Sequence, residues 1–230
     1  QRKQSSFKTN WFNGDMSVTN LFNDKIGDNP VAIIDNFFNK DIVTNWLEYY
    51  QHKADFRYAV EEVENGDALL CHCLELPQVE SIFNMSETLM PFVNEFNELY
   101  DTDLKYTDMC RAHVNLITSN DKFSGHTDST ENGMVVLWFA NPDIKDIGAG
   151  FFLGKHTDGT PSRLISNKFN RLVVFPASMW HCVQAPTNRC TFRISVYLGF
   201  AQYKTNESRE RNYRQQNLVN KFNKRVEVHG

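Results

Sequence analysis

Two histidines and one aspartate are placed where they could hold a metal ion. His126 and Asp128 are separated by a single residue in the segment FSGHTD, residues 123–128. On a strand, side chains two residues apart project from the same side. His181, 53 residues beyond Asp128, opens a short predicted strand and is the natural third ligand. Two imidazoles and one carboxylate can occupy one face of an octahedral metal ion and leave three positions open for other ligands.

An arginine and a serine share one face of the strand predicted over residues 190–200. Its even-numbered positions are apolar, whereas its odd-numbered positions from 191 to 197 are polar. A period of two places Arg193 and Ser195 side by side on the polar face. Because a guanidinium binds a carboxylate through two parallel hydrogen bonds, this pair predicts a carboxylate site. A solvated outer face is the alternative.

A strand predicted over residues 109–116 repeats this arrangement. Arg111, His113 and Asn115 have one parity, and the residues between them are apolar or cysteine. The strand leads through a loop over residues 118–122 into the segment that carries His126. The polar face of this strand is therefore expected to lie near the metal ligands.

These residues, in this order, resemble the Fe(II)/2-oxoglutarate-dependent dioxygenases. The carriers of the resemblance are His126-x-Asp128, His181 and Arg193-x-Ser195. The flanking segments GAGFFL (residues 148–153) and RLVVFP (residues 171–176) are closest to the small prolyl-4-hydroxylase-like branch. The resemblance covers residues 105–200 well and residues 30–100 only in outline.

The resemblance implies a mechanism as well as a ligand set. His126, Asp128 and His181 would hold Fe(II), and Arg193 with Ser195 would bind the far carboxylate of 2-oxoglutarate. The cosubstrate and O2 would be converted to succinate and CO2 while an unactivated C–H bond is hydroxylated, with ascorbate as the reductant. Relatives that halogenate lack the carboxylate ligand, so Asp128 favours hydroxylation.

Further residues are candidates for cosubstrate or substrate contacts. His113 falls where relatives often carry a tyrosine that touches 2-oxoglutarate, and Asn115 shares its face; a packed imidazole is the alternative for His113. Arg111, Trp180 and Arg189 are candidates for substrate contact. Arg189 is also an alternative anchor for the cosubstrate, because some family members use an arginine at about its distance from the last histidine.

The motif His-Thr-Asp occurs a second time, at His156-Thr157-Asp158. Gly159, Thr160 and Pro161 follow it, and Asp-Gly is typical of a tight turn. We expect this copy to lie at a solvated loop tip, a poor place to preorganise ligands.

Short strands without alternating helices predict an α+β, mainly β fold, and the resemblance implies a double-stranded β-helix (jelly-roll) with helices packed on one sheet. Amphipathic helices are expected over residues 41–51 and 80–100, the second kinked or divided by Pro91. The 230 residues are expected to form one domain. Its parts are an irregular arm (1–29), a helical and strand support (30–104), the catalytic core (105–200) and a polar C-terminal helix (201–230).

The amino-acid composition limits the kinds of partner that we expect this chain to bind. Residues 201–230 carry seven Lys/Arg and three Glu, a net +4, so the rest of the −4 chain carries −8. That balance disfavours nucleic acid. No apolar run approaches the roughly 20 residues that span a bilayer. Five scattered cysteines, and no segment like a signal peptide in a chain that starts at Gln, favour a cytoplasmic protein.

We therefore expect a hydroxylase acting on a peptide or protein, with a peptidyl residue such as proline as the acceptor. The acceptor rests on the branch resemblance alone. The same chemistry on a small molecule or a nucleic-acid base is one alternative. A non-catalytic metal-binding barrel is another, and Arg193 argues against it because a site without turnover needs no carboxylate clamp.

Overall fold

A computed structural model describes residues 20–54, 56–58, 70–121, 123–128, 132–141, 149–187 and 192–201. Most of the predicted N-terminal arm, nearly all of the predicted C-terminal helix and Arg189 lie outside these ranges. Among the described residues, no helix is long and apolar enough to cross a membrane. The assignment of the whole chain to one domain and to the cytoplasm stays a prediction.

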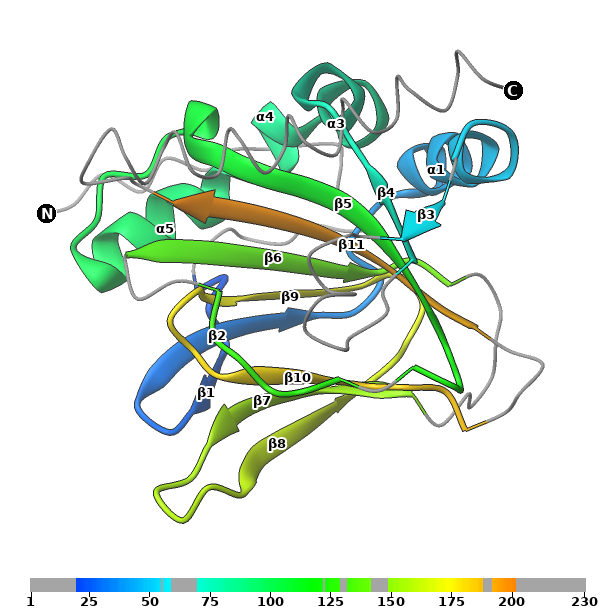
Figure 1. The fold of residues 1–230 in the computed structure, drawn as a ribbon. Coiled ribbons are helices and arrows are strands. Elements are labelled where there is room, and N and C mark those ends of the chain that lie inside the picture. Colours follow the sequence, from blue (N-terminus) through cyan, green and yellow to red (C-terminus); the bar gives the residue numbers. More distant parts are fainter. Residues whose placement is uncertain are drawn as a thin grey trace, which may run out of the picture.

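Two antiparallel sheets form the body of the molecule, and Figure 1 shows the smaller one below the larger one. The large sheet has the strand order β1-β2-β9-β6-β11-β5-β4-β3, and the small one has the order β10-β7-β8. The strands are β1 (Asp24–Ile26), β2 (Asn29–Ile34), β3 (Arg57–Tyr58), β4 (Leu70–Cys73), β5 (Met109–Thr118), β6 (Gly133–Phe139), β7 (Gly150–Lys155), β8 (Pro161–Ser166), β9 (Arg171–Pro176), β10 (His181–Gln184) and β11 (Phe192–Ala201). The predicted mainly β architecture is confirmed.

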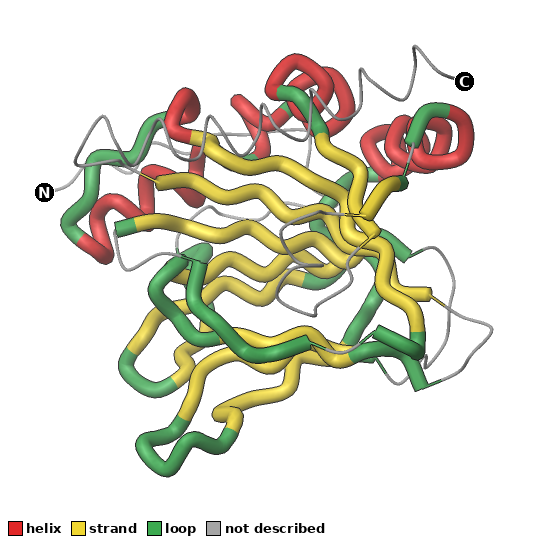
Figure 2. The backbone as a smooth tube through the Cα atoms, viewed as in Figure 1, coloured by secondary structure: helices red, strands yellow, loops and turns green. Residues whose placement is uncertain are grey.

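Helices cover the outer face of the large sheet, as Figures 1 and 2 show. They are α1 (Lys40–His52), α3 (Leu76–Phe83), α4 (Met85–Thr88) and α5 (Met90–Tyr100), followed by the 3-10 turn η1 (Tyr106–Asp108). The predicted division beside Pro91 is confirmed, because α4 ends at Thr88 and α5 begins at Met90, but the predicted start at residue 80 is wrong and a further break at Asn84 was not predicted. The backbone turns left-handed at Asn84 (φ 47°), which ends α3. Pro91 lies in the first turn of α5, where its missing N–H costs nothing.

Strand β11 is buried on both faces, so the alternative of a solvated outer face is excluded for Arg193 and Ser195. The side chains of Ile194, Val196, Leu198 and Phe200 pack under the helices in one core cluster. Its odd-numbered face points between the two sheets, where Tyr197 belongs to a second cluster that also contains residues of β7 and β9. The polar face found in the sequence is therefore an interior wall.

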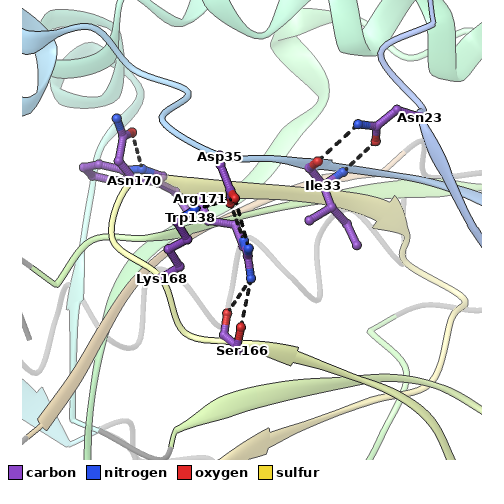
Figure 3. Close-up of polar contacts among 8 residues, drawn as sticks. All are labelled: Asn23, Ile33, Asp35, Trp138, Ser166, Lys168, Asn170 and Arg171. Carbon is purple, nitrogen blue, oxygen red and sulfur yellow. Dashed lines mark hydrogen bonds and ion pairs between the residues drawn. The ribbon is translucent and has the colours of Figure 1, made fainter. Parts of the chain in front are cut away.

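An ion-pair cluster stabilises the connection between β8 in the small sheet and β9 in the large sheet (Figure 3). Asp35, just after β2, pairs with Lys168 and Arg171 at 2.6 Å each. Arg171 also donates hydrogen bonds to the backbone oxygen and hydroxyl of Ser166 at the end of β8. The hydrogen bond from Arg171 is the main reason that the pKa of Asp35 is lowered.

Candidate metal centre and carboxylate pocket

Three side chains that could hold a metal ion meet between the two sheets: His126, Asp128 and His181, called the His–Asp–His set below. His181 begins β10, but the expectation that residues 126–128 form a strand is wrong. His126 makes only an isolated bridge to His181, with N–H···O distances of 2.9 and 2.8 Å. The backbone N–H of Asp128 donates to the oxygen of Ala177 at 3.0 Å. A loop held by three backbone hydrogen bonds, rather than a strand, presents the first two residues of the set.

The possible ligand atoms of the set all lie within 4.8 Å of one another. Nε2 of His126 is 3.6 Å from Oδ1 of Asp128, and Nε2 of His181 is 3.4 Å from its Oδ2. On the far side of each ring, Nδ1 faces a backbone oxygen, that of Ser124 at 3.3 Å and that of Met179 at 3.0 Å. Such contacts fix the tautomer and direct Nε2 of both rings toward the carboxylate.

The protonation states suit a divalent cation. Burial alone would raise the pKa of Asp128, but hydrogen bonding and charge from His126 and His181, with a hydrogen bond from Tyr197, lower it to about 2. Burial lowers the pKa of His181, which favours the neutral ring. An ionised carboxylate with neutral imidazoles is the donor set that iron and other divalent transition metals accept.

Among the three side chains of the set, that of His126 is the most exposed to solvent. The side chain of His126 is 59% exposed, whereas those of Asp128 and His181 are 12% and 6% exposed. The ring of His181 contacts those of Phe151 and Phe175, each with centroids 5.4 Å away. Aromatic rings therefore pack against His181, whereas the His126 side of the set is exposed.

A second group of polar side chains lies deeper in the same wall: Asn115, Arg193 and Ser195, called the carboxylate pocket below. Arg193 and Ser195 are fully buried and Asn115 nearly so, and Ser195 is directly opposite Asn115 in the register of β11 and β5. All three guanidinium nitrogens, the serine Oγ and the asparagine Oδ1 have no hydrogen-bond partner in the described part of the chain. Burial lowers the pKa of Arg193 to about 9, so it stays charged at neutral pH.

A buried charge without a partner costs several kcal/mol, so proteins rarely keep one unless something binds it. The centroid of the Phe139 ring lies 5.0 Å from Cζ of Arg193, and this contact stabilises the cation without satisfying its donors. Donors of this kind can bind an anion with several acceptor oxygens, so the carboxylate site expected from Arg193-x-Ser195 stays a prediction that the burial of these groups allows.

The pocket and the metal set belong to one wall. Tyr197 follows Arg193 by four residues on the same face of β11, roughly 13 Å along the strand. Its hydroxyl donates a hydrogen bond to Oδ2 of Asp128 at 2.9 Å. Tyr197 was not predicted to belong to the site, although it has the same parity as Arg193 and Ser195 on this strand.

The remaining described candidates lie on β5 and beside the loop of His126. His113 stacks on Tyr197, with centroids 4.7 Å apart and an interplanar angle of 6°. Arg111 lies two residues before His113 on β5, directly opposite Gly199 in the register of β11 and β5. Trp180 packs beside the loop of His126 rather than in the core.

The second His-Thr-Asp copy lies where the sequence predicts it, at an exposed turn. His156 and Asp158 are exposed, and backbone hydrogen bonds from Gly159 to His156 and from His156 to Thr160 close the reversal. Within the described residues, neither joins a group that could hold a metal ion. The two copies have the same three residues, but only the surroundings of the first bring it together with a third possible metal ligand among the described residues.

No family model and no curated protein matches this sequence, but solved structures match the architecture. A prolyl-4-hydroxylase from Pseudomonas putida is 15% identical, with a TM-score of 0.61 over 80% of this chain and 99% of that one. The fold is that of the 2-oxoglutarate/Fe(II) oxygenases. This oxygenase fold is also seen in a Trichoplax adhaerens prolyl hydroxylase in complex with a hypoxia inducible factor peptide (16% identity, TM-score 0.51, 79% of this chain and 87% of that one). The α-ketoglutarate-dependent epimerase SnoN of nogalamycin biosynthesis shares it too (10% identity, TM-score 0.55, 80% of each chain). The prediction of a double-stranded β-helix is confirmed.

Proposed function

We propose that this chain is an Fe(II)- and 2-oxoglutarate-dependent dioxygenase that hydroxylates an unactivated C–H bond. The observation that carries the proposal is the buried guanidinium of Arg193, which has no partner in the described structure and lies in the same wall as the His–Asp–His set. A metal-binding barrel without turnover has no reason to keep such a charge in its interior.

The residues of the site fit both groups. His126, Asp128 and His181 would hold Fe(II), which together with 2-oxoglutarate supplies O2 activation and C–H oxidation, with succinate and CO2 as co-products. Arg193 would bind the far carboxylate of the cosubstrate through two hydrogen bonds, and Ser195 would donate a third. Asn115 would add a polar contact on the opposite strand. The Phe151 and Phe175 rings keep water from the buried side of the set.

We infer that the substrate is a peptide or protein, with a proline residue as the first acceptor to test. Two of the similar structures are prolyl hydroxylases, one of them bound to a peptide. The open His126 side would admit such a chain, with Arg111 and Trp180 placed to touch it. Because SnoN is an epimerase of nogalamycin biosynthesis, a small-molecule substrate is the second candidate. Ascorbate would serve as the reductant.

Incubation with Fe(II), ascorbate, O2 and 2-oxoglutarate tests the proposal. We expect succinate to form, and to form faster with a proline-containing peptide library in which mass spectrometry finds +16 Da products. His181→Ala is the control, and it should form no succinate. Absence of succinate from the metal-loaded wild-type protein, with or without peptides, would overturn the proposal. Succinate without a modified peptide would favour the small-molecule alternative.

A further inference from the structure

Tyr197 connects the wall of β11 to the metal set. Its hydroxyl lies 2.9 Å from Oδ2 of Asp128, and its ring is buried between the two sheets. A phenol donates to a carboxylate, so the hydroxyl engages one of the two carboxylate oxygens. Because Asp128 is in a loop and Tyr197 is in a central strand, the hydrogen bond ties a candidate ligand to a rigid part of the fold.

Two neighbours hold the ring of Tyr197 in this position. His113 is its direct partner in the register of β11 and β5, and the two rings stack almost parallel at 4.7 Å. Gly199, two residues further along the same face, leaves the space through which the phenol passes. A Cβ atom at residue 199 would lie 3.0 Å from the Tyr197 hydroxyl oxygen and 3.1 Å from Cε1. That is tighter than nine in ten real Cβ contacts, so the glycine gives the ring its room.

We propose that Tyr197 is a positioning residue for the carboxylate of Asp128, and that His113 and Gly199 form the cradle that aims its hydroxyl. The inference rests on the proposed function, because it concerns the same metal centre. A carboxylate held through one oxygen keeps one orientation and is disfavoured from chelating a metal through both oxygens. Tyr197 would thereby keep coordination positions available for cosubstrate and O2, and His113 would act through Tyr197 rather than by touching 2-oxoglutarate.

Metal binding without cosubstrate tests the inference independently of turnover. Co(II) would be titrated into wild type and Tyr197→Phe, with binding followed by calorimetry and by the visible absorption of the bound ion. Loss of an outer hydrogen bond to a ligand typically weakens metal affinity about 10–100-fold, and we expect a loss in this range with an altered absorption spectrum. Tyr100→Phe is the matched control, because the Tyr100 hydroxyl donates to the oxygen of Pro30 at 2.7 Å, outside the site. It should bind Co(II) as wild type does.

Variants of the cradle separate positioning from simple loss of a hydroxyl. Gly199→Ala keeps the phenol and every candidate ligand, yet it should weaken Co(II) binding in the same direction as Tyr197→Phe. In the Tyr197→Phe background it should add little, because the two changes act through one hydrogen bond. His113→Phe keeps a stacked ring and should retain affinity, whereas His113→Ala should lose it.

The outcomes distinguish this inference from the proposed function. If wild type does not bind Co(II), the metal centre and the positioning role both fail. Equal affinities and spectra for wild type and Tyr197→Phe would overturn the positioning role alone. Weakened binding in Tyr197→Phe, with Tyr100→Phe unchanged, supports the role whether or not the protein turns over 2-oxoglutarate.

Discussion

The indole of Trp180 occupies the space in which a side chain on Gly125 would lie. A Cβ atom at residue 125 would be 1.8 Å from Cζ2 of the indole and 2.2 Å from Cε2. Each of the two residues precedes a histidine of the metal set, His126 and His181. The contact therefore packs the loop that carries one candidate ligand directly against the strand that carries another.

We predict that Gly125→Ala displaces Trp180 and the loop together, because the ring cannot remain 1.8 Å from a methyl group. Co(II) affinity should fall by more than the roughly 100-fold that outer residues reach, since His126 itself must move. The double variant Gly125→Ala/Trp180→Ala has room for the methyl group and should recover most of the binding. Wild-type affinity in the single variant would show that the loop can shift without disturbing the set.

The order of chemistry-bearing residues made most of this site predictable. His126, Asp128 and His181 stand in the order and spacing of a known ligand set, and period two alone put Arg193 beside Ser195. The role of Tyr197 could not be predicted in the same way. It depends on a ring that passes over Gly199 to reach a loop 69 residues away in sequence, a tertiary contact that no local pattern encodes.

The fold, too, was predictable where the local sequence determines the structure and was not predictable where distant contacts determine it. The alternation of apolar and polar residues predicted β5 and β11, because the two faces of a strand follow from its own sequence. The break beside Pro91 was predicted, whereas the break at Asn84 was not, because Asn84 adopts a left-handed backbone (φ 47°) that asparagine tolerates but does not require. The loop at His126 was taken for a strand because its bridge partner, His181, lies far along the chain.

Removal of any one member of the His–Asp–His set should abolish turnover. We predict that His126→Ala, Asp128→Ala and His181→Ala each weaken Co(II) binding by more than the roughly 100-fold expected for outer residues, with circular dichroism unchanged. The second motif offers matched controls with the same residue types. His156→Ala and Asp158→Ala change exposed side chains at a turn and should keep metal binding and cosubstrate turnover. Metal loss in either control would mean that the wrong copy was assigned.

Arg193→Gln should raise the apparent 2-oxoglutarate requirement most among the pocket variants. Truncating one partner of a buried charge pair costs about 2–5 kcal/mol, or roughly 30- to 4,000-fold in affinity. Ser195→Ala removes one hydrogen bond to a charged group, about 1.5–3 kcal/mol, and should have a smaller effect. Cosubstrate titrations of succinate formation measure both.

Arg189→Gln is the comparison that decides between the two candidate anchors. If Arg193 and Ser195 supply the donors for the far carboxylate, as proposed, Arg189→Gln removes no contact to the cosubstrate, so the requirement for 2-oxoglutarate should barely change. A larger effect from Arg189→Gln than from Arg193→Gln would assign the anchor to Arg189 and leave the buried guanidinium of Arg193 in need of another ligand.

Asn170 provides a test of the fold that is separate from the site. Its side chain accepts from the backbone N–H of Phe38 at 2.9 Å and from the indole of Trp138 at 3.1 Å, and donates to the oxygen of Phe38 at 2.8 Å (Figure 3 shows the Trp138 contact). The residue is buried and left-handed, with φ 58°. It therefore satisfies three buried polar groups and occupies a backbone conformation that disfavours most side chains.

Asn170→Ala should lower the free energy of unfolding by roughly 3 kcal/mol or more, since each buried group left without a partner costs about 1–3 kcal/mol. Asn170→Gly loses the same hydrogen bonds but removes the left-handed strain, about 1–2 kcal/mol for a residue with a Cβ atom. We therefore expect the order wild type, then glycine, then alanine in urea unfolding midpoints, with unchanged slopes. An alanine variant as stable as the glycine variant would show that the backbone relaxes out of the left-handed region. The loss common to both would then measure the hydrogen bonds of the asparagine amide alone.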